Sequence, residues 1–241
     1  MGHAVSLSLP KSERDLLLKT ADARLYPSIS DPNFLVLRAR RLIFQKWICE
    51  LQREDVTILD IGGRYQPYRR LFDTKACRYI ACDVTRTELV DVVGNGESLP
   101  FGAETFDVVV ATQVFDYFAQ PHKAAEQIRT VLKPGGWLMM SVASVAPRFR
   151  DDEYWRFTPK GIRGVLSDFS RVTIVPELTS IGGVIRTANL MVNTFAQYGW
   201  VRSLASVTSC PFLNLIGLAL EELRITSNDQ FTPNYSVLAV K

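Results

Sequence analysis

Two acidic motifs end apolar runs that have the form of buried strands. Residues 56–60 form such a run, which closes on Asp60 and is followed by Gly62 and Gly63. Residues 79–83 repeat that form and close on Asp83, 23 positions after Asp60. Glycines let backbone N–H groups approach a ligand without interference from a Cβ atom, and an acid about 20 residues further on can bind a ribose diol. The spacing therefore predicts a nucleoside site, with an aspartate that caps the next helix as the alternative for Asp83.

Strand and helix signals alternate through most of the chain, which indicates how these motifs are positioned. Further strands are predicted at residues 106–111, 137–142, 171–175 and 235–240. A helix is predicted at residues 121–132, which Lys133, Pro134 and two glycines bring to an end. This alternation predicts an α/β fold with a mostly parallel sheet covered by helices on both faces. Ligands of such sheets bind beyond the carboxyl ends of the strands, where Asp60 and Asp83 are expected.

The first 52 residues have a different, helical pattern. Apolar residues recur at helical spacing on both sides of a break at residues 27–32, and Asp31 and Pro32 are expected to open the second helix. We therefore predict an N-terminal helical cap over residues 1–52 of the same domain. The main domain is predicted over residues 53–241, with a helical insertion at about 184–222.

Composition narrows the function class. The 241 residues carry 28 basic and 25 acidic side chains, and the net charge of +3 is scattered, which argues against nucleic-acid binding. The four cysteines have no metal-ligand spacing, so we expect no metal site and free thiols in a reducing cytoplasm. The two histidines, His3 and His122, are expected at the surface.

The apolar stretch at residues 204–220 is too short and too polar to span a bilayer. We predict a buried or interfacial helix there. The sequence leaves open a peripheral membrane contact and a homodimer.

Five blocks recur in an order that resembles a known family. They are the strand and turn at 58–63, Asp83, residues 95–101, residues 105–110, and residues 131–136. Together they resemble the type 11 branch of class I S-adenosylmethionine-dependent methyltransferases. The resemblance covers about residues 58–142 and implies a Rossmann-like, doubly wound sheet of seven strands in the order 3-2-1-4-5-7-6.

The resemblance also implies roles for individual residues toward S-adenosylmethionine. Asp60, Gly62 and Gly63 would line its methionine end, and Asp83 would hold the ribose. Asn95, with the backbone of Gly96 and Glu97, would meet the adenine edge. Thr112 and Gln113 would lie beside the sulfonium.

This chain departs from the family pattern at two places. Tyr65 and Gln66 stand where further glycines are common, which suggests a tighter loop with Tyr68 closing on the cofactor. Asn95 replaces an aspartate, although an amide oxygen can still accept a hydrogen bond from the adenine amino group.

A narrower resemblance points to methyltransferases associated with cell-surface polysaccharide and other glycan biosynthesis. It covers residues 66–69, 112–114, 152–159 and 234–237. Those relatives commonly have an acid and a histidine after the middle segment, whereas this chain has Asp116 and Tyr117. A mechanism that depends on histidine is therefore not expected.

Methyl transfer to a hydroxyl group requires alignment and benefits from a base. Asp116 follows the fourth strand of the family order on the cofactor side, so we predict it as the base or as a clamp on the acceptor. Tyr154, Trp155 and Arg156 are predicted to form a loop over the pocket, with Arg156 available for an anion. The alternative for these three residues is a packed lid held by a structural ion pair.

The sequence thus predicts a methyltransferase that modifies a small-molecule or glycan acceptor, with a hydroxyl favoured. One alternative is a protein of the same fold that binds cofactor but acts as a partner or regulatory subunit. A nicotinamide dehydrogenase would share the first turn and the ribose acid but not residues 99–101 or 132–136.

Overall fold

The computed structural model describes residues 12–75, 78–195, 199–223 and 228–241. The first part contains two helices, α1 (Glu13–Leu25) and α2 (Phe34–Glu50). The Ser12 hydroxyl caps α1 by accepting the Asp15 N–H. The second helix begins at Phe34, slightly later than predicted, because the Asp31 carboxylate accepts the Asn33 N–H in a turn at 2.7 Å.

Seven strands form one sheet in the order β3-β2-β1-β4-β5-β7-β6, as predicted. Their bounds are β1 (Thr57–Ile61), β2 (Arg78–Asp83), β3 (Val92–Val93), β4 (Phe106–Thr112), β5 (Leu132–Ala143), β6 (Arg171–Pro176) and β7 (Asn234–Val240). The first five are parallel, and β7 runs antiparallel between β5 and β6. The two-residue strand β3 was not located from the sequence, because two residues show no alternation.

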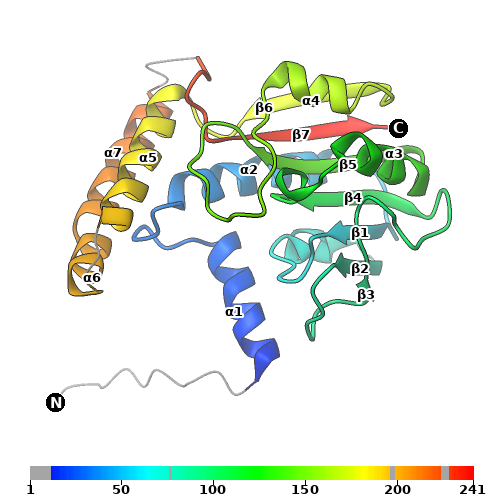
Figure 1. Cartoon of the computed structure of the whole chain (residues 1–241), viewed down its shortest axis with the longest axis horizontal. Helices are drawn as coiled ribbons and strands as arrows, with labels where there is room; N and C mark the ends of the chain where they lie inside the picture. The colour runs from blue at the N-terminus through cyan, green and yellow to red at the C-terminus, as the bar shows by residue number, and fades with distance from the viewer. Residues whose placement is uncertain (1–11, 76–77, 196–198, 224–227) are drawn as a thin grey trace.

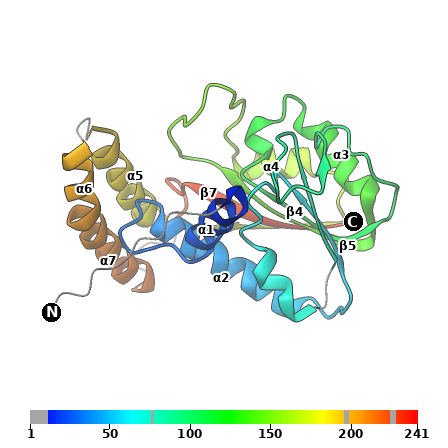
Figure 2. The same cartoon turned by 90° about the horizontal axis from the view of Figure 1, so that it is seen from below.

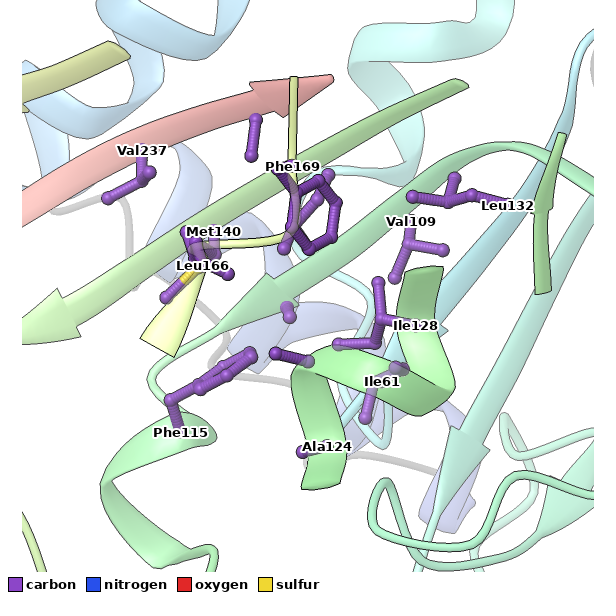
Figure 3. Packing of buried hydrophobic residues seen from close by; sticks show 14 of the residues in the cluster. Ile61, Val109, Phe115, Ala124, Ile128, Leu132, Met140, Leu166, Phe169 and Val237 are labelled. Carbon is purple, nitrogen blue, oxygen red and sulfur yellow. The ribbon is translucent and has the colours of Figure 1, made fainter. Parts of the chain in front are cut away.

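Helices cover both faces of the sheet (Figure 1). One face carries α3 (Pro121–Val131) and α4 (Pro159–Val165), and the other carries α2 and the short helix η1 (Arg69–Lys75). Successive residues of β4 alternate between the two cores, with Val109 toward α3 and Val108 toward α2. Figure 3 shows Ala124 and Ile128 of α3 on the same side of the sheet as Val109.

A third group of helices lies beside the sheet (Figures 1 and 2). It consists of α5 (Ser180–Phe195), α6 (Gly199–Val207) and α7 (Ser209–Glu222), which join β6 to β7. Leu35 and Val36 of α2 form a small core with Leu178, against which Ile185 and Leu218 of this group pack. The carboxyl ends of β1 and β4 point toward this side of the molecule (Figure 1).

The apolar stretch at 204–220 is divided between α6 and α7 at Thr208. Within the described ranges, no helix is both long enough and apolar enough to cross a membrane.

Candidate active site

Two carboxylates end neighbouring strands at the same edge of the sheet. Asp60 of β1 is aligned with Ala81 of β2, and Asp83 is the last residue of β2. Both side chains are buried, with Asp60 2% and Asp83 7% exposed. The pKa of Asp60 is raised to about 7. Burial is the main cause, the charge of Asp83 also raises the pKa, and a hydrogen bond from Tyr79 opposes both effects. The two acids therefore act on one another electrostatically, as a shared site requires.

The turn between these strands depends on glycine. Gly62 has a φ of +76°, in the left-handed region that favours glycine. The Gly62 N–H donates to the Cys82 carbonyl at 2.8 Å, which folds the turn across the end of β2. A Cβ on Gly63 would lie 2.7 Å from the Asp60 carbonyl oxygen. The turn therefore needs glycine at Gly63, because any residue with a Cβ would push the chain away from β1.

Asp83 holds the turn that follows β2 with one of its two carboxylate oxygens. Its Oδ1 accepts the Thr85 N–H at 2.8 Å, which stabilises the following turn. Its Oδ2 has no hydrogen-bond partner within the described ranges. One oxygen thus remains available for a ligand, and the turn fixes the orientation of the carboxylate.

The loop after β3 brings Gly96 to the end of β1. A Cβ on Gly96 would lie 2.5 Å from the Phe118 ring and 3.3 Å from the Ile61 side chain. Asn95 Oδ1 accepts the Glu97 N–H at 3.0 Å. Glu97 Oε1 accepts the Gln120 N–H at 2.7 Å, just before α3. The Glu97 carboxylate thus holds this loop to the start of α3, and the backbone of the loop lies near β1.

Asp116 lies in the short helix η2 (Phe115–Tyr117) that follows β4. Its side chain is 3% exposed, and Oδ1 accepts the Ala143 N–H at 3.2 Å. Burial raises the pKa of Asp116 to about 6, although the Ala143 N–H and Arg156 both lower it. A carboxylate with a pKa close to neutrality can accept a proton during a reaction.

The segment at residues 144–157 crosses over Asp116. The Asp116 carbonyl accepts the N–H groups of Tyr154 at 2.8 Å and of Trp155 at 3.2 Å. The Trp155 indole N–H donates to the Phe118 carbonyl at 2.7 Å. The Tyr154 side chain is 63% exposed. This segment, which we call the Asp116 loop, is thus attached to η2 through its backbone.

Arg156 is used inside the Asp116 loop. It forms an ion pair with Glu153 and donates to the Pro147 carbonyl at 3.0 Å. Glu153 also accepts the Tyr117 hydroxyl hydrogen at 3.2 Å. The ion pair agrees with the alternative given for Arg156, and an anion-binding role for this residue stays a prediction.

The central part of the chain is similar to known methyltransferases. Residues 59–140 match the family model described as a methyltransferase domain. The seven-stranded sheet is also that of a SAM-dependent methyltransferase from Archaeoglobus fulgidus. The two structures superpose with a TM-score of 0.52 at 14% identity, over 84% of this chain and 94% of that one. The chain has the class I methyltransferase fold.

Two curated relatives share the methyltransferase region. A biotin biosynthesis bifunctional protein, BioHC, of Teredinibacter turnerae is 27% identical over 100 residues, 42% of this chain and 16% of that protein. An uncharacterized methyltransferase of Mycolicibacterium vanbaalenii is 26% identical over 98 residues, 36% of this chain and 38% of that protein. The chain therefore spans less than two fifths of either relative.

Within this methyltransferase fold, Tyr68 lies on the side of the sheet that α2 covers. Its side chain is buried, and its ring packs on Phe44 of α2 with centroids 4.9 Å apart. The loop after Gly63 folds against α2 because the other aromatic and aliphatic side chains of that core lie there. The structure thus places Tyr68 in the core beside α2, and its contact with the cofactor stays a prediction.

Thr112 and Gln113 follow β4, but Gln113 turns toward β5. Thr112 is the last residue of β4 and is aligned with Ser141 of β5. Gln113 has a φ of +53°, and its side-chain amide donates to the Ser141 hydroxyl at 3.0 Å. Its side chain therefore belongs to the polar network that includes Ser141.

This network, centred on Glu177, was not found from the sequence. Arg40 of α2 binds both carboxylate oxygens of Glu177, at 2.8 and 3.0 Å. The hydroxyls of Ser141 and Ser236 donate to Glu177 Oε1 at 2.6 and 2.8 Å, and the Asn234 amide donates to Oε2 at 3.1 Å. Glu177 directly follows β6, so the rule that polar residues meet at the carboxyl edge of a sheet could have identified it.

Within the described ranges, no group of three metal-ligating side chains is present. A cavity of about 1020 Å³ lies between α3 and α4 and contains none of the predicted cofactor contacts. Arg156 of the Asp116 loop lies in its lining, together with residues of α3 and α4. His122 is exposed, as expected, and His3 lies outside the described residues.

Proposed function

We propose that this chain is an S-adenosylmethionine-dependent methyltransferase that methylates a hydroxyl of a small-molecule or glycan acceptor. The observation that carries the proposal is the meeting of Asp60 and Asp83 around the turn at Gly62 and Gly63. A nucleoside-containing cation needs such a set: acids for its ammonium and ribose, and a close backbone.

The residues present fit S-adenosylmethionine. Asp60 offers negative charge to the ammonium of the methionine part, and Asp83 Oδ2 offers an acceptor to the ribose diol. The backbone at Gly96 and Glu97 offers polar groups to the adenine edge, and the Asn95 side chain supports it. When bound, the cofactor supplies an electrophilic methyl group on a sulfonium.

Asp116 is proposed as the base toward the acceptor. The bound cofactor would supply the methyl group to the acceptor oxygen and keep the thioether as its leaving group, and the Asp116 carboxylate would accept the hydroxyl proton. The buried position of Asp116 under its loop favours this role, because the site excludes water around the proton transfer.

The glycan class of the acceptor rests on the resemblance of residues 66–69, 112–114, 152–159 and 234–237 to glycan-modifying methyltransferases. A cytoplasmic location is proposed from the four cysteines of the sequence, whose spacing shows no metal-ligand pattern and is typical of thiols in a reducing compartment. Trp200, Val207, Phe212 and Leu215 expose large apolar side chains on α6 and α7. They support the two contacts that the sequence left open, a homodimer and a peripheral membrane contact, which gel filtration and vesicle sedimentation test separately.

Calorimetric titration with S-adenosylmethionine tests the cofactor assignment. The wild-type chain should bind, and Asp83→Ala should weaken binding at least tenfold because the ribose loses its acceptor. Asp31→Ala is the matched control, since Asp31 also accepts a backbone N–H two residues on but lies away from the site. Equal affinities of both variants would contradict the assignment.

Incubation with candidate acceptors and mass spectrometry then tests transfer. A gain of one methyl group by a hydroxylated acceptor supports the enzyme. Cofactor binding with no transfer to a broad acceptor panel would favour the alternative of a binding or regulatory protein.

A further inference from the structure

Arg186 of α5 is a buried cation with an unused donor. The residue is 4% exposed. Its Nε and Nη2 both donate to one acceptor, Asn33 Oδ1, at 3.2 and 2.9 Å. Its Nη1 is buried and has no hydrogen-bond partner among the residues that the structure describes. Buried donors normally find a partner, so this group calls for an explanation.

The charge of Arg186 is also not neutralised. Arg186 forms no ion pair within the described ranges, and its acceptor Asn33 is a neutral amide. Glu177 is the acid whose charge acts on Arg186, but both of its oxygens are bound by Arg40. Burial lowers the pKa of Arg186 to about 10, and the charge of Arg40 lowers it as well. The guanidinium therefore stays protonated at neutral pH, and an unpaired buried charge is costly.

The Asp116 loop connects Arg186 to the proposed site. The ring of Phe149 in this loop lies over the guanidinium, with the Arg186 Cζ 5.6 Å from the ring centroid. The Phe149 N–H donates to Glu153 of the same loop, whose later residues Tyr154 and Trp155 bind the Asp116 carbonyl. The loop lies between α5 and the sheet in both views (Figures 1 and 2). One loop thus contacts Asp116 at one end and Arg186 at the other.

Phe149 gives a route to the guanidinium. Its side chain is 55% exposed, so one of the groups that cover the guanidinium is an aromatic residue of a surface loop. A modest movement of this loop would open Nη1 to a ligand, and the ring could then cover that ligand.

We propose that Arg186 binds an oxyanion, a carboxylate or a phosphate, carried by the methyl acceptor. The acceptor would then be an acidic molecule, with its anion on Arg186 and its hydroxyl near Asp116. An oxyanion would satisfy Nη1 and compensate the charge at the same time. The identification of the anion as part of the methyl acceptor rests on the proposed function. Anion binding by Arg186 does not depend on it.

Anion binding can be measured without knowing the acceptor. Inorganic phosphate and succinate are the two probes, and each is titrated into the full chain by calorimetry at constant ionic strength. We expect one or both to bind the wild type, and the stronger probe indicates which anion the acceptor carries. Arg186→Gln should weaken that binding at least tenfold, because the amide can reach Asn33 but carries no charge. Arg186→Lys should retain a measurable part of it.

Arg70→Gln is the matched control. Arg70 is an exposed arginine paired with Asp22 at the surface, so its loss should leave anion binding unchanged. Equal weakening in the Arg70 and Arg186 variants would show general electrostatic attraction and would overturn the proposal.

Thermal unfolding in the absence of anion provides a second test of whether the charge of Arg186 is uncompensated. Because an uncompensated charge is removed, Arg186→Gln should unfold at the same temperature as the wild type or higher. A variant that is clearly less stable, with no probe binding to the wild type, would make Arg186 a structural residue. If the wild type binds S-adenosylmethionine but neither anion, only this inference fails; if it binds an anion but no S-adenosylmethionine, the proposed function fails and the anion site stands.

Discussion

The Tyr79 hydroxyl donates a hydrogen bond to Asp60 Oδ2 at 2.7 Å, from the beginning of β2 to the carboxyl-terminal part of β1. This bond favours the ionised carboxylate, whereas burial and the nearby Asp83 oppose ionisation. The balance leaves the pKa of Asp60 at about 7, so that its charge changes near neutral pH.

Cofactor affinity should therefore depend on pH through Asp60. Ionised Asp60 is the form that attracts an ammonium, so the dissociation constant for S-adenosylmethionine should rise as the pH falls through 7. One pH unit below the pKa, about a tenth of the carboxylate is ionised and affinity should be roughly tenfold lower. Tyr79→Phe removes the bond that lowers the pKa and should move the midpoint upward. Calorimetry from pH 5.5 to about 8.5 checks this, and a flat profile in both proteins would contradict it.

Asp116→Asn should separate binding from turnover. Loss of a general base lowers turnover by about 10²- to 10⁴-fold, while the affinity for S-adenosylmethionine should change less than about twofold. In the wild type, turnover should rise with pH through about 6, where Asp116 loses its proton. Steady-state kinetics with an acceptor found by mass spectrometry provide the measurement. Asp151→Asn is the control, because Asp151 is an exposed acid of the same loop; equal rates for the two variants would remove Asp116 from this role.

Gly63→Ala should disturb the cofactor turn. The added Cβ would lie 2.7 Å from the Asp60 carbonyl and 3.1 Å from the Ala81 side chain, so the backbone of the turn must shift. We expect a loss of about 1–3 kcal/mol of stability and a clearly weaker affinity for S-adenosylmethionine. Urea unfolding and calorimetry measure the two effects. Gly164→Ala serves as the control, since a Cβ there meets nothing within 4 Å and alanine favours the helix. Normal cofactor affinity in Gly63→Ala would show that the turn does not approach the cofactor.

Glu177→Gln should destabilise the fold strongly. It would leave the buried Arg40 guanidinium without its carboxylate, and breaking a buried pair in this way costs about 3–5 kcal/mol. Replacing both partners in Arg40→Met, Glu177→Leu should cost less than the single change, because no unpaired charge remains. Asp22→Asn, which breaks the exposed pair with Arg70, should cost at most about 1 kcal/mol. Urea unfolding of the wild type and the three variants measures these changes in the free energy of unfolding. A loss in Glu177→Gln as small as that in Asp22→Asn would count against a tightly coupled network.

Much of the fold was predictable because its signals are local. The apolar runs that became β1, β2, β4, β5, β6 and β7 are short and are bounded by turn residues, and α3 shows its buried face in its own sequence. The strand order came from the resemblance of five blocks, and the sheet confirms it. The positions of Asp60 and Asp83 followed from these, because parallel strands bring their carboxyl ends to one edge.

Residues that depend on distant partners were less accessible. In the sequence, Arg40 is one of two adjacent arginines with no evident partner. In the structure it binds Glu177, 137 positions away. The sequence also did not show that the Tyr68 ring packs on Phe44 of a helix that precedes the sheet.

By itself, the sequence determined the strands, the glycine turn after β1 and the two acids, since each is set by neighbours in the chain and by the geometry of parallel strands. Only the tertiary structure decided which charges are paired. Arg156 is held by Glu153 of its own loop, Arg40 by Glu177, and Arg186 by a neutral amide alone. Charge pairing depends on distances between elements that no local pattern encodes, so the surroundings of the acceptor emerge only once the helices have packed on the sheet.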